Sequence, residues 1–539
     1  MKHGSLLLIM LSLLLTSCGK QDPYAGDEKQ KVKLKKDNHS NYVFDANSTN
    51  ENGSMSYEIF VRSFYDSDGN GIGDLNGVTQ KLPYLQEMGI KTIWLMPINP
   101  SPSYHGYDVK DYYGVNPDYG TIQDLDNLVR EANSRNIDIM LDMVLNHSSR
   151  SHPAFRQSYN DYLSNNTGED SKKDWYNWST TNIGAKYGDL YYECGFGSDM
   201  PDFNLDSVTL RAEIDNICKF WIQDHGIKGF RLDAVYHYYN TNTTRNVEFL
   251  SWLDTTVKKY NSNFYMVGEA WIGDSVLTGY SASTMESFFK FDNASGGDKS
   301  LINVAKGFNA INIFNSMYKY EKNIKQNNPK AYSSYFLSNH DQDRISKNFD
   351  ETQNKVAASI LGLLPGTSFM YYGEEIQLVG TRTTGLNDDG TDVKRRLPIV
   401  WSKKDKTGEC AFPQPERRDL DNVKQVELGV YDQLGKNYSL LNHYKKVINV
   451  RNKYPFIKNG LMTSAQALLN TDLASVIAYK IENQSTGDYI IVVHNLSEYN
   501  VEVDAPGEEI IDEINTSRRI PEIKNGKLRL GRYSTVIIH

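Results

Sequence analysis

The chain has 539 residues, enough for three or four domain-sized units or for one large barrel with attached domains. Apolar residues make up 39% and charged residues 23%, which is the composition of a globular protein and excludes a largely disordered chain. The formal net charge is −9, so we expect no chain-wide attraction to nucleic acid or to anionic membranes. Tyr contributes 36 residues, which suits ordinary amphipathic packing or ring stacking on sugars, and composition alone favours ordinary packing.

The first 17 residues have the pattern of a secretory signal. Lys2 precedes an apolar run from Leu6 to Leu15, and small residues lead to Cys18. The run is too short to span about 30 Å of hydrocarbon comfortably. The order Leu15-Thr16-Ser17-Cys18 resembles a bacterial lipobox, in which the Cys becomes the lipidated first residue of the mature protein. A cleaved signal followed by a chance Cys is the alternative.

Residues 19–53 are rich in Gly, Asn, Lys and Asp and poor in apolar residues, which indicates a flexible tether. As a coil, this segment would reach roughly 30–35 Å. Basic nucleic-acid binding is the weaker alternative, because few aromatic residues interleave its lysines. Cys194, Cys218 and Cys410 are the other cysteines, and they favour buried thiols over a disulfide framework, although a pair involving Cys194 stays open.

Eight short, nearly continuous apolar segments alternate with helical patterns from residue 54 onward. Such strands predict a parallel sheet that is covered on both faces, and eight of them predict an α/β fold of the (β/α)8 TIM-barrel type. The predicted strands cover residues 57–61, 92–96, 137–142, 229–233, 264–269, 287–291, 335–339 and 367–371.

Two further regions depart from the barrel pattern. Residues 148–207, after the third strand, are rich in Tyr, Asn, Ser, Gly and Trp and predict an excursion domain. Period-two alternation at 473–479, 489–493 and 534–538 predicts a C-terminal antiparallel β-sandwich over 455–539. The barrel is then assigned to 54–147 and 208–454, preceded by the signal at 1–17 and by Cys18 with the tether at 18–53.

Charged side chains follow four of the predicted strands. These segments are Asp142 to His147, Arg231 to His237, Glu269 to Trp271, and Asn339 to Asp341. In a TIM barrel, catalytic groups lie at the carboxyl ends of the strands. A single such Asp is more often a capping or ion-paired residue, but four strand ends together favour a catalytic site. Converging carboxylates suit glycoside hydrolysis, in which one attacks the anomeric carbon and another protonates the leaving oxygen. Arg231 lies on the same side of its strand as Asp233, and we expect it to orient Asp233 and keep it ionised.

These four segments resemble the four signature regions of the α-amylase family, glycoside hydrolase family 13. Met200-Pro201-Asp202-Phe203-Asn204 resembles the fifth region of that family. The resemblance covers roughly residues 54–539 and implies that Asp233 is the nucleophile, Glu269 the general acid/base and Asp341 the transition-state stabiliser of a retaining mechanism. It also implies sugar-binding roles for a further set of residues: His105, Tyr107, Asp108, His147, Arg231 and His340. Tyr107 would stack beneath the sugar ring, with a packed loop aromatic as its alternative.

The subtype rests on finer detail. Met-Pro-Asp-Phe-Asn is similar to the intermediary group of the family, with Phe203 in place of the usual Leu. Tyr236-His237 resembles the Lys-His pattern of α-amylases, and Ala234 stands where α-glucosidases usually have Val. We therefore favour an endo-acting α-1,4-glucanase that acts on starch and maltooligosaccharides. With its lipobox, the chain resembles cell-surface amylases of Gram-negative starch-utilisation systems, which favours an outer-membrane lipoprotein facing the cell surface, with the periplasmic face as the alternative.

Other functions stay open beside this one. An exo-acting α-glucosidase or oligo-1,6-glucosidase, a neopullulanase or a transglycosylase would share the fold. A surface starch-binding lipoprotein is the non-enzymatic alternative, and the three carboxylates argue against it. Surface glycan-binding and import proteins are the expected partners, together with the α-glucan itself and the lipid anchor on Cys18. No nucleic-acid partner is expected.

One loop has the spacing of a calcium site. Asp66, Asp68, Asn70 and Asp74 supply oxygen atoms at positions 1, 3, 5 and 9, Ile72 supplies a carbonyl at position 7, and Gly71 stands at position 6. Gly77 replaces the bidentate Glu usual at position 12. The loop resembles the calcium loop of oligo-1,6-glucosidase-type members, and a bare turn is the alternative.

The resemblance implies a second structural Ca²⁺ held by Asn146, Asp202 and His237. A hydrogen-bonded network without metal is the alternative. No organic cofactor is expected, and no Cys/His cluster at ligand spacing suggests zinc.

Overall fold

A computed structural model describes residues 55–539, apart from 295, 298, 348, 383–390, 413–425, 427 and 517–519. The predicted signal, Cys18 and the predicted tether lie outside the described residues. In the part that is described, no helix has the length and apolar character needed to span a bilayer.

Eight parallel strands close into a barrel in the order β1-β11-β10-β9-β8-β7-β3-β2, as the sequence predicts. The predicted ranges differ from the observed ones at their ends. Residues 337–339 lie beyond the end of β10, for example, although their sequence continues the apolar pattern. The strands are β1 (Met55–Ile59), β2 (Thr92–Leu95), β3 (Asp138–Met143), β7 (Gly229–Leu232), β8 (Tyr265–Gly268), β9 (Ser287–Phe289), β10 (Tyr332–Phe336) and β11 (Thr367–Tyr371).

Large side chains fill the barrel interior. Trp94, Met140, Val267, Phe289 and Phe369, each from a different strand, form one buried cluster. The ring of Phe289 contacts Phe369 at 4.8 Å and Trp94 at 5.6 Å between centroids. The interior is therefore a packed core without room for a ligand, so a ligand of the barrel can bind only at its two ends.

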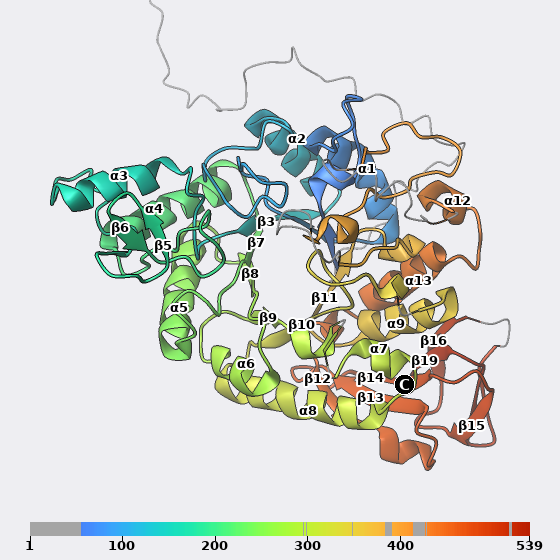
Figure 1. Cartoon of the computed structure of the whole chain (residues 1–539). Helices are drawn as coiled ribbons and strands as arrows, with labels where there is room; N and C mark the ends of the chain where they lie inside the picture. The colour runs from blue at the N-terminus through green and yellow to red at the C-terminus, as the bar shows by residue number, and fades with distance from the viewer. Residues whose placement is uncertain are drawn as a thin grey trace, which may run out of the picture. The chain divides into compact units, whose positions relative to one another are not determined.

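Helices cover the outside of the barrel (Figure 1). Several begin at side-chain caps; Thr121 and Asp124 form a capping box at the start of α2, for example. The helices are α1 (Leu75–Met88), α2 (Ile122–Asn133), α4 (Val208–Lys219), α5 (Thr243–Tyr260), α6 (Asp274–Tyr280), α7 (Leu301–Ala305), α8 (Ala310–Asn327), α9 (Glu351–Leu363), α12 (Val430–Leu434) and α13 (Leu440–Lys453).

An excursion leaves the barrel between β3 and β7, as predicted. It contains α3 (Pro153–Leu163) and a small antiparallel sheet of β4 (Trp178–Ser179), β6 (Leu190–Tyr192) and β5 (Ala185–Tyr187), drawn in cyan to green in Figure 1. Phe155 packs between Trp178 and Tyr192, with ring centroids 5.2 and 5.0 Å away. Most aromatic side chains between residues 174 and 192 are buried and belong to the core of this excursion, so they do not account for the sugar stacking that the Tyr content of the chain left open.

The C-terminal part is a sandwich of two antiparallel sheets. One sheet has the order β12-β13-β14-β19-β16 and the other β15-β18-β17. Val476, Val493, Leu528 and Val536 belong to the core cluster between the sheets. The predicted strand at Leu473 begins only at Val476, because Leu473 is 43% exposed and outside the ladder. The strands are β12 (Leu461–Ser464), β13 (Val476–Glu482), β14 (Tyr489–Asn495), β15 (Val501–Asp504), β16 (Ile510–Asn515), β17 (Glu522–Lys524), β18 (Lys527–Leu530) and β19 (Ser534–Ile538).

The three cysteines in the described part of the chain are free thiols. Cys218 and Cys410 are buried and Cys194 is half-buried, so Cys194 has no disulfide partner among the described residues.

Candidate active site

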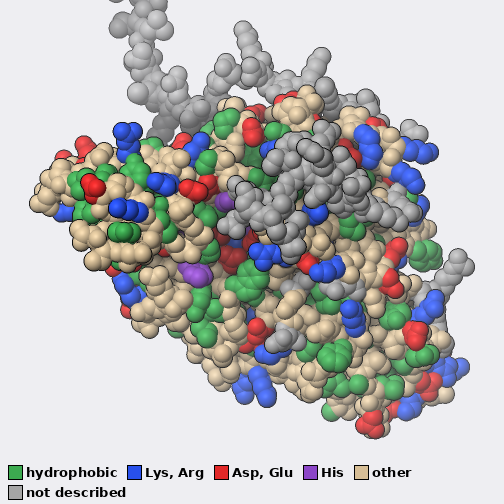
Figure 2. All heavy atoms as spheres, in the orientation of Figure 1, with side chains coloured by type: hydrophobic (Ala, Val, Ile, Leu, Met, Phe, Trp, Pro, Cys, Tyr) green, Lys and Arg blue, Asp and Glu red, His purple; other side chains and the backbone are tan. Residues whose placement is uncertain are grey.

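The three predicted catalytic carboxylates line one cavity. Asp233 and Glu269 directly follow β7 and β8, and Asp341 lies in the loop after β10. All three border a cavity of about 280 Å³ at the carboxyl end of the barrel. Figure 2 shows acidic and histidine side chains gathered in a hollow beside the excursion. The topology thus brings together residues that are more than a hundred positions apart in the sequence.

Arg231 connects the carboxylates at the centre of this site. Its Nη1 donates to Asp233 Oδ1 at 2.8 Å and to Asp142 Oδ1 at 2.8 Å, and its Nη2 lies 2.9 Å from Glu269 Oε1. The side chain is 1% exposed, so these charged contacts are shielded from water. Sequence reasoning paired Arg231 with Asp233 alone, whereas the structure places one guanidinium among three carboxylates.

Asp341 is held ionised by its cationic neighbours. His340 Nε2 lies 3.0 Å from Asp341 Oδ2, and Arg396 Nη2 donates to Asp341 Oδ1 at 2.8 Å. Burial raises the pKa of Asp341, but the His340 and Arg396 charges outweigh burial and hold that pKa well below its usual range. Burial opposes the charge of His340, yet the Asp341 and Glu58 carboxylates raise the pKa of His340 to about 10. His340 is therefore an imidazolium at neutral pH.

Glu269 has the opposite environment. Burial raises its pKa, the Arg231 charge lowers it, and the Asp233 and Asp341 anions raise it further, with a net upward shift. Its Oε2 accepts a hydrogen bond from the Ala234 amide at 2.9 Å. Ala234 has φ +49°, a conformation that non-glycine residues seldom adopt. This strained position aims the Ala234 amide at Glu269, so local backbone strain coincides with the functional site.

The pKa of Asp233 depends on burial and on the charges of both Arg231 and Asp341. Burial raises its pKa, and the Arg231 guanidinium opposes the shift without cancelling it. We expected Arg231 to keep Asp233 ionised, but burial together with the nearby Asp341 anion outweighs Arg231 and leaves the pKa of Asp233 raised.

The predicted sugar-binding residues lie around the same cavity. Tyr107 stacks against His340 with ring centroids 5.5 Å apart, and its hydroxyl lies 2.6 Å from His340 Nε2. His105 lies on the other side of Tyr107, with ring centroids 6.1 Å apart. Buried His147 Nε2 has no hydrogen-bond partner among the described residues, so it is free to bind a substrate hydroxyl. Burial lowers the pKa of His147 to about 4 and keeps the ring neutral.

Asp108 lies farther along the cleft. It is 4% exposed and accepts hydrogen bonds from Ser101 and Ser103. It borders a second cavity of about 740 Å³, which shares His105 with the catalytic cavity. Asp108 therefore lines the outer cleft rather than the catalytic cavity.

Three charged residues at this site were not among the candidate catalytic or sugar-binding residues. Glu58, in β1, has Oε1 2.5 Å from His340 Nδ1. Asp142, in β3, accepts hydrogen bonds from Arg231 and from the Tyr107 hydroxyl at 3.1 Å, and burial raises its pKa to about 7. Arg396 directly follows a short 3-10 helix, Val393–Arg395. Glu58 and Asp142 could have been found from the sequence, because each is a charged residue inside an apolar strand. Arg396 could not, because it lies in a loop without periodicity.

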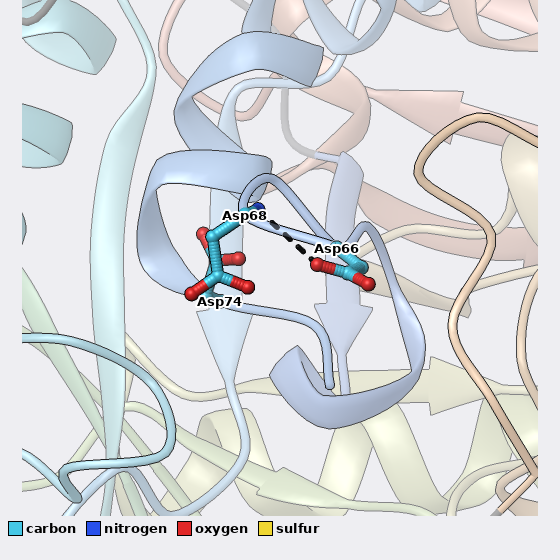
Figure 3. A group of neighbouring side chains, drawn as sticks. All are labelled: Asp66, Asp68 and Asp74. Carbon is cyan, nitrogen blue, oxygen red and sulfur yellow. Dashed lines mark hydrogen bonds between the residues drawn. The ribbon is translucent and has the colours of Figure 1, made fainter. Parts of the chain in front are cut away.

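The predicted calcium loop brings its acids together between β1 and α1 (Figure 3). Ligand oxygens of Asp66, Asp68 and Asp74 all lie within 4.8 Å of one another. The Asp68 amide donates to Asp66 Oδ1 at 3.2 Å, and Asn70 Oδ1 accepts from the Ile72 amide at 2.7 Å. Two oxygens on opposite sides of a Ca²⁺ ion lie roughly 5 Å apart, so this spacing fits one ion.

In the second predicted metal site, Asn146 and Asp202 contact each other directly, whereas His237 has no hydrogen bond to either of them in the described part of the chain. Asn146 Nδ2 donates to Asp202 Oδ1 at 3.0 Å, and the Gly195 amide donates to Asp202 Oδ2 at 2.8 Å. His237 is exposed to the catalytic cavity and packs against Phe196 at 5.0 Å. The contacts of Asp202 fit the hydrogen-bonded alternative as well as a ligand set.

Comparison with known proteins agrees with this geometry. A family model described as "Alpha amylase, catalytic domain" matches residues 58–460. Alpha-amylase 3 of Dictyoglomus thermophilum is 36% identical over 493 residues, covering 89% of this chain and 92% of that protein. Oligo-1,6-glucosidase of Parageobacillus thermoglucosidasius is 27% identical, covering 82% and 89%. The solved structure of Eubacterium rectale Amy13B has a TM-score of 0.82 and 35% identity, covering 91% of this chain and 96% of that chain. The family model spans most of the chain and the barrel carries the acids at its carboxyl end, so the chain is a glycoside hydrolase that belongs to the α-amylase family.

Proposed function

We propose that the protein is a retaining, endo-acting α-1,4-glucan hydrolase that cleaves starch and maltooligosaccharides. The single observation that carries the proposal is the shared cavity of Asp233, Glu269 and Asp341, in which neighbouring charges shift the pKa values of Glu269 and Asp341 in opposite directions. A raised pKa suits Glu269 as the proton donor, and a lowered pKa keeps Asp341 an anion that can stabilise positive charge.

In this mechanism Asp233 attacks the anomeric carbon while protonated Glu269 gives its proton to the departing glycosidic oxygen. Asp233 and the glucosyl unit are then joined by a covalent bond. The Glu269 carboxylate next takes a proton from water, and the resulting oxygen nucleophile releases the sugar with its original anomeric configuration. One guanidinium contacts both carboxylates, at 2.8 and 2.9 Å, which supports the close spacing used by retaining enzymes. Ionised Asp341 stabilises the positive charge that develops on the sugar ring.

The shape of the cleft supports internal cleavage. The catalytic cavity continues on one side into the cavity of about 740 Å³ and on the other into one of about 650 Å³. Phe196 borders the first junction and Trp271 the second, and they are 43% and 54% exposed. Exposed aromatic faces at both junctions suit glucosyl units that extend beyond the cleavage point in both directions.

We also propose that Ca²⁺ binds the loop of Asp66, Asp68 and Asp74, with Asn70 and the Ile72 carbonyl completing the oxygen ligands. The ion would hold the loop between β1 and α1 in place. The supporting observation is the convergence of three carboxylates within 4.8 Å. Binding at Asn146, Asp202 and His237 remains a proposal based on the family pattern.

For the location, we propose a lipid anchor on Cys18 in the outer membrane, facing the cell surface. The Leu-Thr-Ser-Cys order after an apolar run supports this placement. Surface glycan-binding and import proteins would then be the neighbours of the enzyme.

A time course of products from amylose, pullulan and α-cyclodextrin tests the proposed function. An endo-acting α-1,4-glucanase releases a mixture of maltooligosaccharides from amylose at the earliest time points. Mainly glucose at those points would indicate an α-glucosidase, and faster cleavage of pullulan than of amylose would indicate a neopullulanase. If soluble starch yields no new reducing ends, the protein is a binding lipoprotein and the proposal is wrong.

A further inference from the structure

A second polar cavity lies at the end of the barrel opposite the carboxyl ends of the strands. It has a volume of about 370 Å³ and takes no part in the site described above. Six strands contribute residues at or near their first positions: Ser56, Thr92, Asp138, Gly229, Tyr265 and Thr367. In TIM barrels the active site lies at the carboxyl ends of the strands, and the opposite end usually serves stability. A charged cavity at that opposite end therefore calls for a separate explanation.

Three lysines line this cavity, which we call the basal cavity. They are Lys91, Lys228 and Lys458, and Asp138 is the one carboxylate that borders it. Lys91 is 9% exposed, and the other two lysines are half-buried. The lining residues thus carry more positive than negative charge.

Lys458 is fixed in place from outside the barrel. Its carbonyl accepts a hydrogen bond from the Gly366 amide at 2.8 Å, just before β11. Its Nζ faces the rings of Tyr265 and Tyr332, 5.6 and 5.2 Å from their centroids. In the described part of the chain, neither the Lys228 nor the Lys458 ammonium group forms a hydrogen bond or an ion pair with a carboxylate.

Two carboxylates, Glu286 and Asp138, act on the charge of Lys458, but neither forms a direct ion pair with it. Burial lowers the pKa of Lys458, the charges of these two carboxylates oppose that shift, and the Arg451 charge adds to it. Arg451 donates instead to the carbonyls of Gly362 and Leu364, at 2.8 and 2.7 Å. A partly buried cation without a direct ion pair is unfavourable, and an anion between the lysines would relieve this cost.

Neutral donors complete the lining. Asn136, Asn261 and Asn263 present amides, and Thr367 and Tyr265 present hydroxyls. Amide and hydroxyl groups beside a cluster of ammonium groups suit an anion with several oxygen atoms. We propose that the basal cavity is a binding site for a phosphate group, either as inorganic phosphate or as a small phosphate monoester, formed by Lys91, Lys228 and Lys458.

Calorimetric titration of the whole protein with inorganic phosphate tests this site. We expect binding to wild type and a loss of about tenfold or more in affinity for both Lys228→Gln and Lys458→Gln. Lys458→Arg keeps the charge and should retain the affinity within about threefold. Lys173→Gln, a change on the surface of the excursion, is the matched control and should bind as wild type does.

A parallel titration with glucose 6-phosphate distinguishes the two sources of the phosphate group. Tighter binding than inorganic phosphate, lost in the same variants, identifies a phosphate monoester as the ligand. Melting temperatures without phosphate show whether each variant is folded, and Lys228→Gln decides if Lys458→Gln does not fold. Undiminished binding in a folded Lys228→Gln or Lys458→Gln variant, or no binding of either probe at about 10 mM, would overturn the proposal.

Discussion

At the scale of single residues, the charges around Arg231 separate the roles of the carboxylates. Asp233→Asn keeps the shape of the side chain and an oxygen that can accept from Arg231, but it removes the nucleophile. We expect kcat on maltoheptaose to fall below about a thousandth of wild type, a loss of at least about 4 kcal/mol of transition-state stabilisation. Steady-state kinetics and circular dichroism measure activity and fold.

Asp254→Asn, which changes a buried carboxylate paired with Lys258 on α5, is the matched control and should keep its activity. A higher residual rate in a folded Asp233→Asn enzyme would refute the assignment.

Glu58 and His340 form a buried ion pair whose contribution to stability depends on pH. The pKa of His340 rises from 6.5 to about 10 in the folded protein, so its contribution is complete below pH 6.5 and is lost as pH rises through 10. Glu58→Gln removes the carboxylate beside a buried imidazolium and should cost about 3 kcal/mol at pH 7. Urea unfolding at pH 7, 8, 9 and 10 should show this deficit shrinking, at up to about 1.4 kcal/mol per pH unit.

The pair of Lys355 and Glu351, in which the Glu351 side chain is 54% exposed, supplies the control for this measurement. Glu351→Gln should change the free energy of unfolding by less than about 1 kcal/mol at every pH. If the loss of unfolding free energy in Glu58→Gln stays constant from pH 7 to pH 10, Glu58 does not raise the pKa of His340.

The positions of Asp233, Glu269 and Asp341 could be predicted because each ends a strongly apolar strand or closely follows one. Their mutual contacts could not. The spacing of Arg231 and Asp233 by two residues predicts one shared side of a strand, but the bonds of Arg231 to Asp142 and Glu269 arise from neighbouring strands of the closed barrel. Likewise Arg396 contacts Asp341 from a loop whose sequence has no periodicity that would predict this contact.

At the scale of elements, the loop before α1 combines metal binding with helix capping. Asp74 Oδ1 accepts from the Gly77 amide at 2.7 Å and caps α1, so changing Asp74 would alter the helix as well as the metal site. Asp68 is exposed and hydrogen bonds only within its own turn. Asp68→Asn is therefore the variant that reports on metal binding.

We expect Ca²⁺ to raise the melting temperature of wild type, since an ion at a hundred times its Kd adds about 2.7 kcal/mol of stability. Calorimetry with and without Ca²⁺ should show a much smaller increase for Asp68→Asn. Asp118→Asn removes another exposed acid near this region and should respond to Ca²⁺ as wild type does. An equal response of Asp68→Asn and wild type, or none in wild type, would contradict a metal site in this loop.

The strands of the barrel were easier to predict than those of the sandwich, for a physical reason. Barrel strands are buried on both faces, so their apolar runs are nearly continuous and stand out in the sequence. In the sandwich, β15 and β17 are short strands with exposed residues, and their pattern is faint. Leu473 continues the alternation of β13 but lies outside the sheet, because alternation alone does not mark where pairing with a neighbour begins.

At the scale of the whole molecule, the two ends of the barrel have different chemistry. The carboxyl end gathers Asp233, Glu269 and Asp341 around the cavity that we propose binds a neutral glucan. The opposite end gathers Lys91, Lys228 and Lys458 around the basal cavity. The packed interior, with Trp94 and Phe289 among its side chains, separates the two sites, so a ligand in the basal cavity would not compete directly with glucan.

The proposed membrane location depends on one residue, Cys18, that precedes the residues of both sites in the sequence. Cys18→Ser removes the lipid-accepting thiol, and no helix in the described part of the chain could span the bilayer instead. We expect wild type in the membrane fraction and Cys18→Ser in the soluble fraction, with incorporation of labelled palmitate only in wild type. The kcat of the two proteins on maltoheptaose should agree within about twofold, because the described residues that line the catalytic cavity begin at His105 in the sequence, well after residue 18. Cys194→Ser, at a half-buried free thiol of the excursion, should stay in the membrane fraction. Palmitate on Cys18→Ser, or an unlabelled wild type in the soluble fraction, would show that the lipobox resemblance is misleading.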